Sequence, residues 1–159
     1  MKLRITLLAF FICLNPINPI FGQAKDTTNQ KLGLGVSLFN LTEYTYESQS
    51  FSTIYVTYDL SSKFRIEPTI GFSKSDGKAH YMLGIGIFGI KPIQNFNLLY
   101  GLRLGAGSNE IFFVAPTLSG EYYFMKNFSV GSEVQLRVSS NHRDFTLLTN
   151  TSIIMRFYF

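Results

Sequence analysis

The sequence predicts an all-β fold, an eight-stranded antiparallel up-and-down β-barrel that spans a membrane and has a filled polar lumen. Three observations support this prediction: apolar and polar residues alternate, one pattern recurs every 32 residues, and the mid-strand charges share one face. Successive side chains on a β-strand point to opposite faces of the sheet, so each alternating segment separates two environments. A membrane barrel needs this separation, because lipid surrounds its outer face.

The N-terminal segment is predicted to be a secretory signal peptide and not part of the barrel. Lys2 and Arg4 give it a positive start, residues 5–14 are apolar, and small residues precede a cleavage site after Ala24. Its apolar run is shorter than the roughly 20 residues that a spanning helix needs. We therefore predict a signal peptide at residues 1–24 and the barrel at residues 25–159, with cleavage after Gly22 as the alternative.

The composition after cleavage excludes several classes of function. The single cysteine, Cys13, leaves with the signal peptide, so neither a disulfide nor a thiol nucleophile is expected. The formal charge falls from +4 to +2 when Lys2 and Arg4 are removed, which does not predict a nucleic-acid partner. The chain holds 16 Phe and 9 Tyr but only 15% charged residues, a balance that suits a membrane barrel.

A repeat sets the expected number of strands. Leu32, Phe64, Phe96 and Phe128 are spaced 32 residues apart, and each follows a Lys or an Asn. A fixed period indicates a repeated supersecondary unit. A unit of this length suits one β-hairpin, with two strands of about 10 residues and two connections. Four units predict eight strands, with short turns at 59–63, 91–95 and 125–127 and longer loops at 40–50, 73–78, 107–110 and 139–144.

The alternation assigns charged residues to the inner face. In residues 64–73, for example, Phe64 and Ile66 alternate with Arg65 and Glu67, and the segments 96–105, 112–124 and 128–138 follow the same rule. A charge that faces hydrocarbon at mid-depth costs about 2–4 kcal/mol, so the charged face is expected to point inward. The predicted polar network of the lumen consists of Arg65, Glu67, Arg103, Glu121, Glu133, Arg137 and Arg156.

These inward charges predict a packed interior. Eight strands enclose a lumen just wide enough for side chains to fill, and breaking a buried ion pair costs about 3–5 kcal/mol. We therefore expect a static core, cross-linked with Asn97, Gln135 and Tyr158, in preference to a gate that opens to ions. A soluble sandwich with one wet face is the alternative fold, but it does not account for the repeat.

Two prolines disagree with the strand pattern. Pro68 and Pro116 fall in mid-strand, where each removes a ladder hydrogen bond, so we expect bulges or a shift of phase there. Aromatic residues gather where a membrane–water interface would place them. Near the short turns these are Tyr58, Phe64, Phe96, Tyr122, Phe124, Phe128, Phe157 and Phe159, and near the longer loops Phe72, Tyr81, Phe112 and Phe145.

The final segment carries the most recognisable pattern. Ile153, Met155, Phe157 and Phe159 share one strand face, and this ending resembles the assembly signal of bacterial outer-membrane barrels. The whole pattern resembles the small eight-stranded barrels of the outer membrane protein beta-barrel domain family, a class that includes OmpX and the membrane domain of OmpA. The resemblance implies a monomer in the cell outer membrane of a Gram-negative envelope. Its implied partners are outer-membrane lipid, lipopolysaccharide and the barrel-assembly machinery.

The sequence predicts no catalytic residues, metal site or cofactor. His80 and His142 are its only imidazoles, and each has Ser and Asp neighbours of the kind found in small barrels that modify lipid A. The His-x-Ser motif of the lipid A deacylases is absent, however, and nucleophilic catalysis needs the groups in mutual reach. We therefore expect a structural or surface-interaction role, with a narrow conduit for small or hydrophobic molecules and a lipid-A-modifying enzyme as alternatives.

Overall fold

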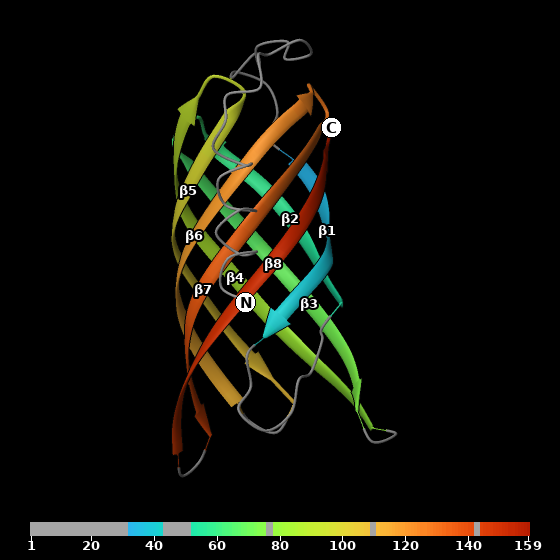
Figure 1. Ribbon diagram of the computed structural model, residues 1–159, viewed down its shortest axis with the longest axis vertical. Helices are drawn as coiled ribbons and strands as arrows, with labels where there is room; N and C mark the ends of the chain where they lie inside the picture. The colour runs from blue at the N-terminus through green and yellow to red at the C-terminus, as the bar shows by residue number, and fades with distance from the viewer. Residues whose placement is uncertain (1–31, 43–51, 76–77, 109–110, 142–143) are drawn as a thin grey trace, which may run out of the picture.

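A computed structural model shows a closed antiparallel barrel of eight strands in sequence order, with β8 paired to β1 (Figure 1). The structure describes residues 32–42, 52–75, 78–108, 111–141 and 144–159, so the predicted signal peptide lies outside the described residues. The predicted all-β, eight-stranded, up-and-down barrel is confirmed. The strands are β1 (Leu32–Thr42), β2 (Ser52–Ser61), β3 (Phe64–Ser75), β4 (Lys78–Ile93), β5 (Phe96–Gly107), β6 (Ile111–Met125), β7 (Phe128–Asn141) and β8 (Asp144–Tyr158).

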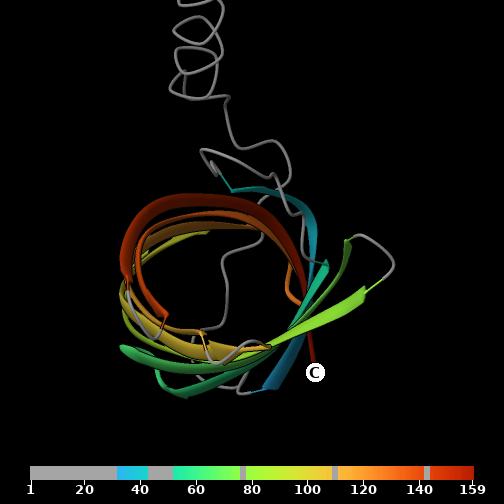
Figure 2. The same ribbon diagram turned by 90° about the horizontal axis from the view of Figure 1, so that it is seen from below.

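Because the sheet is closed, alternate side chains along each strand point into the barrel and away from it. Figure 2, a view from one end, shows the strands as a ring. In β2 the side chains alternate strictly between exposed and buried from Ser52 to Asp59. In β3, Phe64 is 39% exposed, whereas its neighbour Arg65 is fully buried. The face assignments made for β3, β5, β6 and β7 are therefore correct.

The sequence predicts short turns at one end of the barrel and longer loops at the other. The short turns that join β2 to β3, β4 to β5 and β6 to β7 are confirmed, and we call their end of the barrel the short-turn end. At the opposite end, the segments 73–78 and 139–144, expected as longer loops, are partly strand, because pairing continues to Ser75↔Lys78 and Asn141↔Asp144. Of the expected loop at 107–110, Gly107 belongs to β5, and most of the expected loop at 40–50 lies outside the described residues. Strands of 16 and 15 residues, such as β4 and β6, result. Polar residues there do not mark the end of pairing.

The expected bulges at the two prolines are wrong. Pro68 pairs with Ile85 and Pro116 with Leu102 in unbroken register. The β2–β3 and β6–β7 registers are also the same on both sides of each proline. A proline removes only its own N–H from the ladder, and the surrounding pairs hold the register. Among the described pairs, register shifts occur at Ser37/Phe39, Asp59/Ser61 and Tyr123/Met125.

Glycines on the inner wall make room for aromatic rings. A Cβ added to Gly33 would meet the Tyr158 ring at 2.8 Å, and a Cβ on Gly86 or Gly105 would collide with the ring of Phe88 or Phe113. Each of these rings is buried. Aromatic side chains therefore occupy interior space beside the charged groups, and their size is accommodated by the absence of a side chain on a neighbouring glycine.

Candidate functional site

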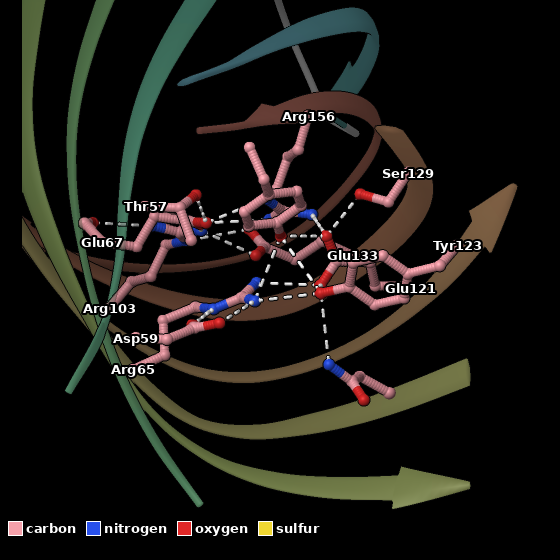
Figure 3. A network of polar contacts seen from close by, with 12 residues as sticks. Thr57, Asp59, Arg65, Glu67, Arg103, Glu121, Tyr123, Ser129, Glu133 and Arg156 are labelled. Carbon is pink, nitrogen blue, oxygen red and sulfur yellow. Dashed lines mark hydrogen bonds and ion pairs between the residues drawn. The ribbon is translucent and has the colours of Figure 1, made fainter. Parts of the chain in front are cut away.

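The interior holds a group of charged side chains whose contacts cross the barrel (Figure 3). Six of the seven charges that the sequence predicts to face inward are buried, with exposures of 3% or less, and Asp59 joins them at 7%. We call this group the interior ionic cluster. Its members are Asp59, Arg65, Glu67, Arg103, Glu121, Glu133 and Arg156.

Arg103 connects two strands that do not pair with its own. Its Nη2 donates to Glu67 Oε1 on β3 at 2.5 Å and to Glu133 Oε2 on β7 at 2.8 Å, and its Nε donates to Glu133 Oε1 at 2.8 Å. Since β5 pairs only with β4 and β6, both links pass through the interior. Gln135 adds a hydrogen bond from Nε2 to Glu133 Oε1 at 2.5 Å. Glu133 thus accepts hydrogen bonds from two nitrogens of the Arg103 guanidinium, one on each carboxylate oxygen. This bidentate arrangement is the strong geometry for an arginine–carboxylate pair.

Glu67 is the point at which two arginines meet. Besides Arg103, it accepts from Arg156 Nε at 2.9 Å and from Arg156 Nη2 at 3.1 Å, one bond on each carboxylate oxygen. The hydroxyl of Thr57 donates to Glu67 Oε2 at 2.7 Å. Arg156 lies on β8, which β1 and β2 separate from β3 around the ring. One carboxylate therefore connects walls of the barrel that have no backbone contact.

Arg65 is the centre of a second group of contacts, which lies nearer the short-turn end than the contacts around Glu67. Its Nη1 donates to Glu121 Oε2 on β6 at 2.9 Å, and its Nε donates to Asp59 Oδ1 on β2 at 2.6 Å. Its Nη2 donates to the hydroxyl of Tyr158 at 3.1 Å. The two centres meet at Arg156, whose Nη1 lies 3.9 Å from Glu121 Oε1.

Hydroxyl groups complete the coordination of Glu121. Ser129 Oγ donates to Glu121 Oε1 at 2.5 Å, Tyr123 donates to Oε2 at 3.0 Å, and the Tyr158 hydroxyl also donates to Oε1. Asn97 Nδ2 in turn donates to the Tyr123 hydroxyl at 3.2 Å. A buried carboxylate is stable only when its oxygens are hydrogen-bonded, and Glu121 meets that condition on both oxygens.

Aromatic faces fill the space beside the guanidinium groups. The central carbon of Arg103 lies 5.1 Å from the ring centre of Tyr55 and 5.0 Å from that of Phe88, and Arg156 lies 5.7 Å from Tyr55. A cation within about 6 Å of a ring centre is attracted by the ring, more strongly in desolvated surroundings. The rings therefore both hold the arginines in place and occupy interior space beside them.

Arg137, the seventh predicted inward charge, lies outside the interior ionic cluster. It is half-buried on β7, and its guanidinium carbon sits 4.0 Å from the ring centre of Phe113. Its Nη2 donates to Gln135 Oε1 at 3.0 Å and its Nη1 to the sulfur of Met82 at 3.6 Å. Gln135 therefore connects Arg137 to Glu133. Asn97, Gln135 and Tyr158, predicted to cross-link the interior, all take part in these contacts.

Sequence reasoning misses four polar residues of the site. It predicts a turn at Asp59 and gives no role to Thr57, Tyr123 or Ser129. A signal for all four exists in the alternation: Thr57 and Asp59 occupy the same face of β2, Tyr123 is two residues beyond Glu121, and Ser129 shares a face with Glu133. The polar end of β2 was read as a connection, although Asp59 still pairs with Arg65 across the strands.

The histidines and the β8 residues lie elsewhere. His80 belongs to β4, where its Nδ1 is 3.2 Å from Ser108 Oγ, while His142 lies outside the described residues. Among the described residues, no group of three His, Cys, Asp or Glu side chains could hold a metal ion. The predicted assembly residues are on the outer side: Ile153, Phe157 and Phe159 are exposed and Met155 half-exposed.

Compared with known proteins, the chain matches no family model and no curated protein. Within the part that the structure describes, no helix is long and apolar enough to cross a membrane. The architecture is an eight-stranded, antiparallel, closed β-barrel with a buried ionic cluster, and it is consistent with a small outer-membrane barrel.

Glu67→Ala should destabilise the barrel by about 3–5 kcal/mol, because it leaves two buried arginines without a shared carboxylate. The measurement is the free energy of unfolding in urea, with the protein refolded into lipid vesicles. Lys78→Ala, a change of an exposed residue, is the control and should alter stability by less than about 0.5 kcal/mol. Equal stabilities of the two variants would show that the cluster does not hold the walls together.

Proposed function

We propose that the protein is an integral β-barrel of the cell outer membrane, with a structural or surface-interaction role and no wide pore. The observation that carries this proposal is the outer surface of the barrel. Every strand exposes large apolar side chains, whereas a soluble monomer rarely exposes an apolar patch of more than a few hundred Å². Examples, one from each strand in order, are Leu34, Val56, Phe72, Ile87, Leu102, Leu118, Val134 and Ile153.

The distribution of polarity between the two faces supports lipid as the surrounding medium. A small soluble barrel fills its interior with apolar residues and turns polar ones to water. Here Arg65, Glu67 and Glu121 are fully buried, while Leu118 and Tyr100 are each 55% exposed. Hydrocarbon around the barrel accounts for both halves of this arrangement, because it removes the cost of the apolar exterior and imposes a cost on any charge there.

Aromatic side chains at both ends support the same environment. Phe124 and Phe157 are exposed at the short-turn end, and Phe112 and Phe145 at the opposite end. Aromatic rings favour the membrane–water interface, and outer-membrane barrels carry girdles of them at both levels. We therefore place the lipid-covered band between these two sets, with outer-membrane lipid and lipopolysaccharide as the partners of the exposed surface.

The interior ionic cluster supports a barrel that does not conduct. An ion that crossed the interior would have to pass between β3 and β8 where Arg156 binds Glu67, and between β3 and β6 where Arg65 binds Glu121. Separating such a buried pair costs several kcal/mol. The alternative function is a narrow conduit, and a measurement of conductance distinguishes it from a closed barrel.

We further propose that the barrel-assembly machinery recognises the outer face of β8 and that the protein has no catalytic activity. Ile153, Met155, Phe157 and Phe159 line this face, and the Phe159 N–H donates to Leu32 O at 3.0 Å across the β1–β8 junction. A strand that closes the barrel is a suitable element for recognition before closure, when its backbone groups are still unpaired. The alternative is a lipid-A-modifying enzyme, which would change the mass of lipid A in cells that express the protein. Mass spectrometry of lipid A distinguishes the two functions.

The protein is expected to fractionate with outer membranes and to migrate differently on gels before and after boiling. The physical reason is that a closed barrel in detergent keeps its backbone hydrogen bonds until heat breaks them. Cell fractionation followed by electrophoresis of boiled and unboiled samples makes the measurement. Recovery of a folded, soluble monomer without detergent would contradict the proposal.

Leu118→Arg should destabilise the folded barrel in a bilayer by about 2–4 kcal/mol, because Leu118 lies in the middle of the outer face of β6. Phe112→Arg is the matched control on the same face near the end of the strand, where the cost falls to about 0–1 kcal/mol. The free energy of unfolding in lipid vesicles measures both. If the two variants lose equal stability, the surface is not covered by lipid as proposed.

Planar bilayers that contain the purified barrel should show no stable single-channel currents of porin size. The expectation follows from the ion pairs that cross the interior. Glu67→Ala provides the comparison, because removal of the carboxylate between Arg103 and Arg156 should raise the frequency of brief openings. Large, stable currents from the unaltered protein would mean that the interior conducts.

A further inference from the structure

At the end of the barrel opposite the short turns, β1 and β2 stop before their neighbours do. β1 ends at Thr42, which pairs with Asn150, whereas β8 extends as far as Asp144. In Figure 1 the ends of β1 and β2 lie well short of the tip of the β7–β8 hairpin. Residues 144–149 therefore pair with β7 on one side and, within the described ranges, with no strand on the other. We call this stretch the β8 edge.

The backbone groups of β8 alternate between its two neighbours. The N–H of Tyr158 donates to Asn127 O, in the turn before β7, at 2.9 Å, and the N–H of Phe159 donates to Leu32 O on β1 at 3.0 Å. The β7–β8 register is unbroken, so even-numbered residues of β8 bond to β7 and odd-numbered residues point to the other side. The residues that present N–H and C=O groups at the β8 edge are therefore Phe145, Leu147 and Thr149.

Exposed apolar side chains accompany these backbone groups. Phe145 is 82% exposed and Leu147 63% exposed, both on the outer face of β8. A strand added along the β8 edge would place every second side chain beside this row, since directly opposite residues on one face have Cβ atoms about 5 Å apart. The backbone groups can bond to any extended chain, and the apolar row favours a chain with apolar side chains at alternate positions.

A second copy of this barrel does not fit the β8 edge. Antiparallel pairing of two such edges uses a two-fold axis perpendicular to the sheet, which would turn one barrel upside down relative to the other. Parallel pairing would tilt the two barrel axes strongly against each other, because strands of membrane barrels are inclined by about 35–45° to the axis. Neither arrangement suits two barrels in one bilayer, so the partner is a different chain.

We infer that the β8 edge binds an extended segment of another protein by strand addition, with apolar side chains of that segment beside Phe145 and Leu147. The added strand continues the ladder that β1 forms with β8 from Thr42 onward. An unpaired edge is a template for pairing with another chain, and near lipid its unsatisfied backbone groups are costly. The inference deepens the proposed surface-interaction role and rests on it, since it names the class of partner.

The test follows hydrogen exchange of single amides by NMR, with the barrel in detergent micelles. Before any peptide is added, the amides of Phe145, Leu147 and Thr149 should exchange faster than those of Thr146 and Leu148, which bond to β7. The probe is a synthetic peptide of alternating valine and threonine with a lysine at each end. When it occupies about nine-tenths of the barrels, exchange at the three odd-numbered amides should slow by about tenfold, with the other two unchanged.

Leu147→Pro tests the backbone contact directly. It removes an N–H from the β8 edge and none from the β7 ladder, and proline is tolerated where a strand edge faces away from its neighbour. It should weaken peptide binding, measured by fluorescence anisotropy, by about fivefold, the equivalent of one net hydrogen bond. Leu147→Ala is the matched control, because it loses the side chain but keeps the N–H, and it should bind the peptide more tightly than Leu147→Pro does.

A second control leaves the barrel unaltered. The same peptide with N-methyl groups on alternate residues lacks the N–H groups of one edge and should not bind. Four results would each overturn the inference: no binding of the unmethylated peptide, equal binding of the methylated one, equally slow exchange at all five amides before peptide is added, and exchange that slows with barrel concentration alone. Failure of the barrel to insert in lipid vesicles would instead refute the proposed function.

Discussion

The pairing of Glu67 with Arg103 and Arg156 is the interaction on which the interior depends. Backbone hydrogen bonds join each strand only to its two neighbours, and they leave opposite walls of the barrel independent. The bonds from β5 and β8 to a single carboxylate on β3 tie those walls together. Each partner needs the others, because a charge without its partner in this interior would carry the full cost of its desolvation.

This constraint explains why aromatic rings and hydroxyl groups surround the charges. Arg103 lies within 5.1 Å of the ring centres of both Tyr55 and Phe88, and Glu121 accepts from Ser129 and two tyrosines. The rings exclude water, which strengthens the ion pairs, and the hydroxyl groups satisfy oxygens that the arginines do not reach. Glycines opposite the rings are a consequence of the same packing, since a barrel of eight strands has little interior volume.

The outer surface follows from the inner one. Because strand residues alternate, every charge placed inside puts its neighbours outside, and on the six strands that carry an interior charge most of those neighbours are apolar. The proposed lipid around the barrel is consistent with this arrangement.

The 32-residue repeat and the alternation along each segment were enough to predict the eight strands, their order and the inward face of β3, β5, β6 and β7. The period of two is a property of each strand alone, so Arg65, Glu67 and Arg103 could be assigned before any contact was known. The partners could not be assigned, because Arg103 meets Glu67 and Glu133 only once the sheet has closed with a particular register. Asp59 joins the cluster because it pairs with Arg65 on the adjacent strand. Both prolines stay in register because residues on adjacent strands hold them there, and the sequence of a single strand contains no information about those residues.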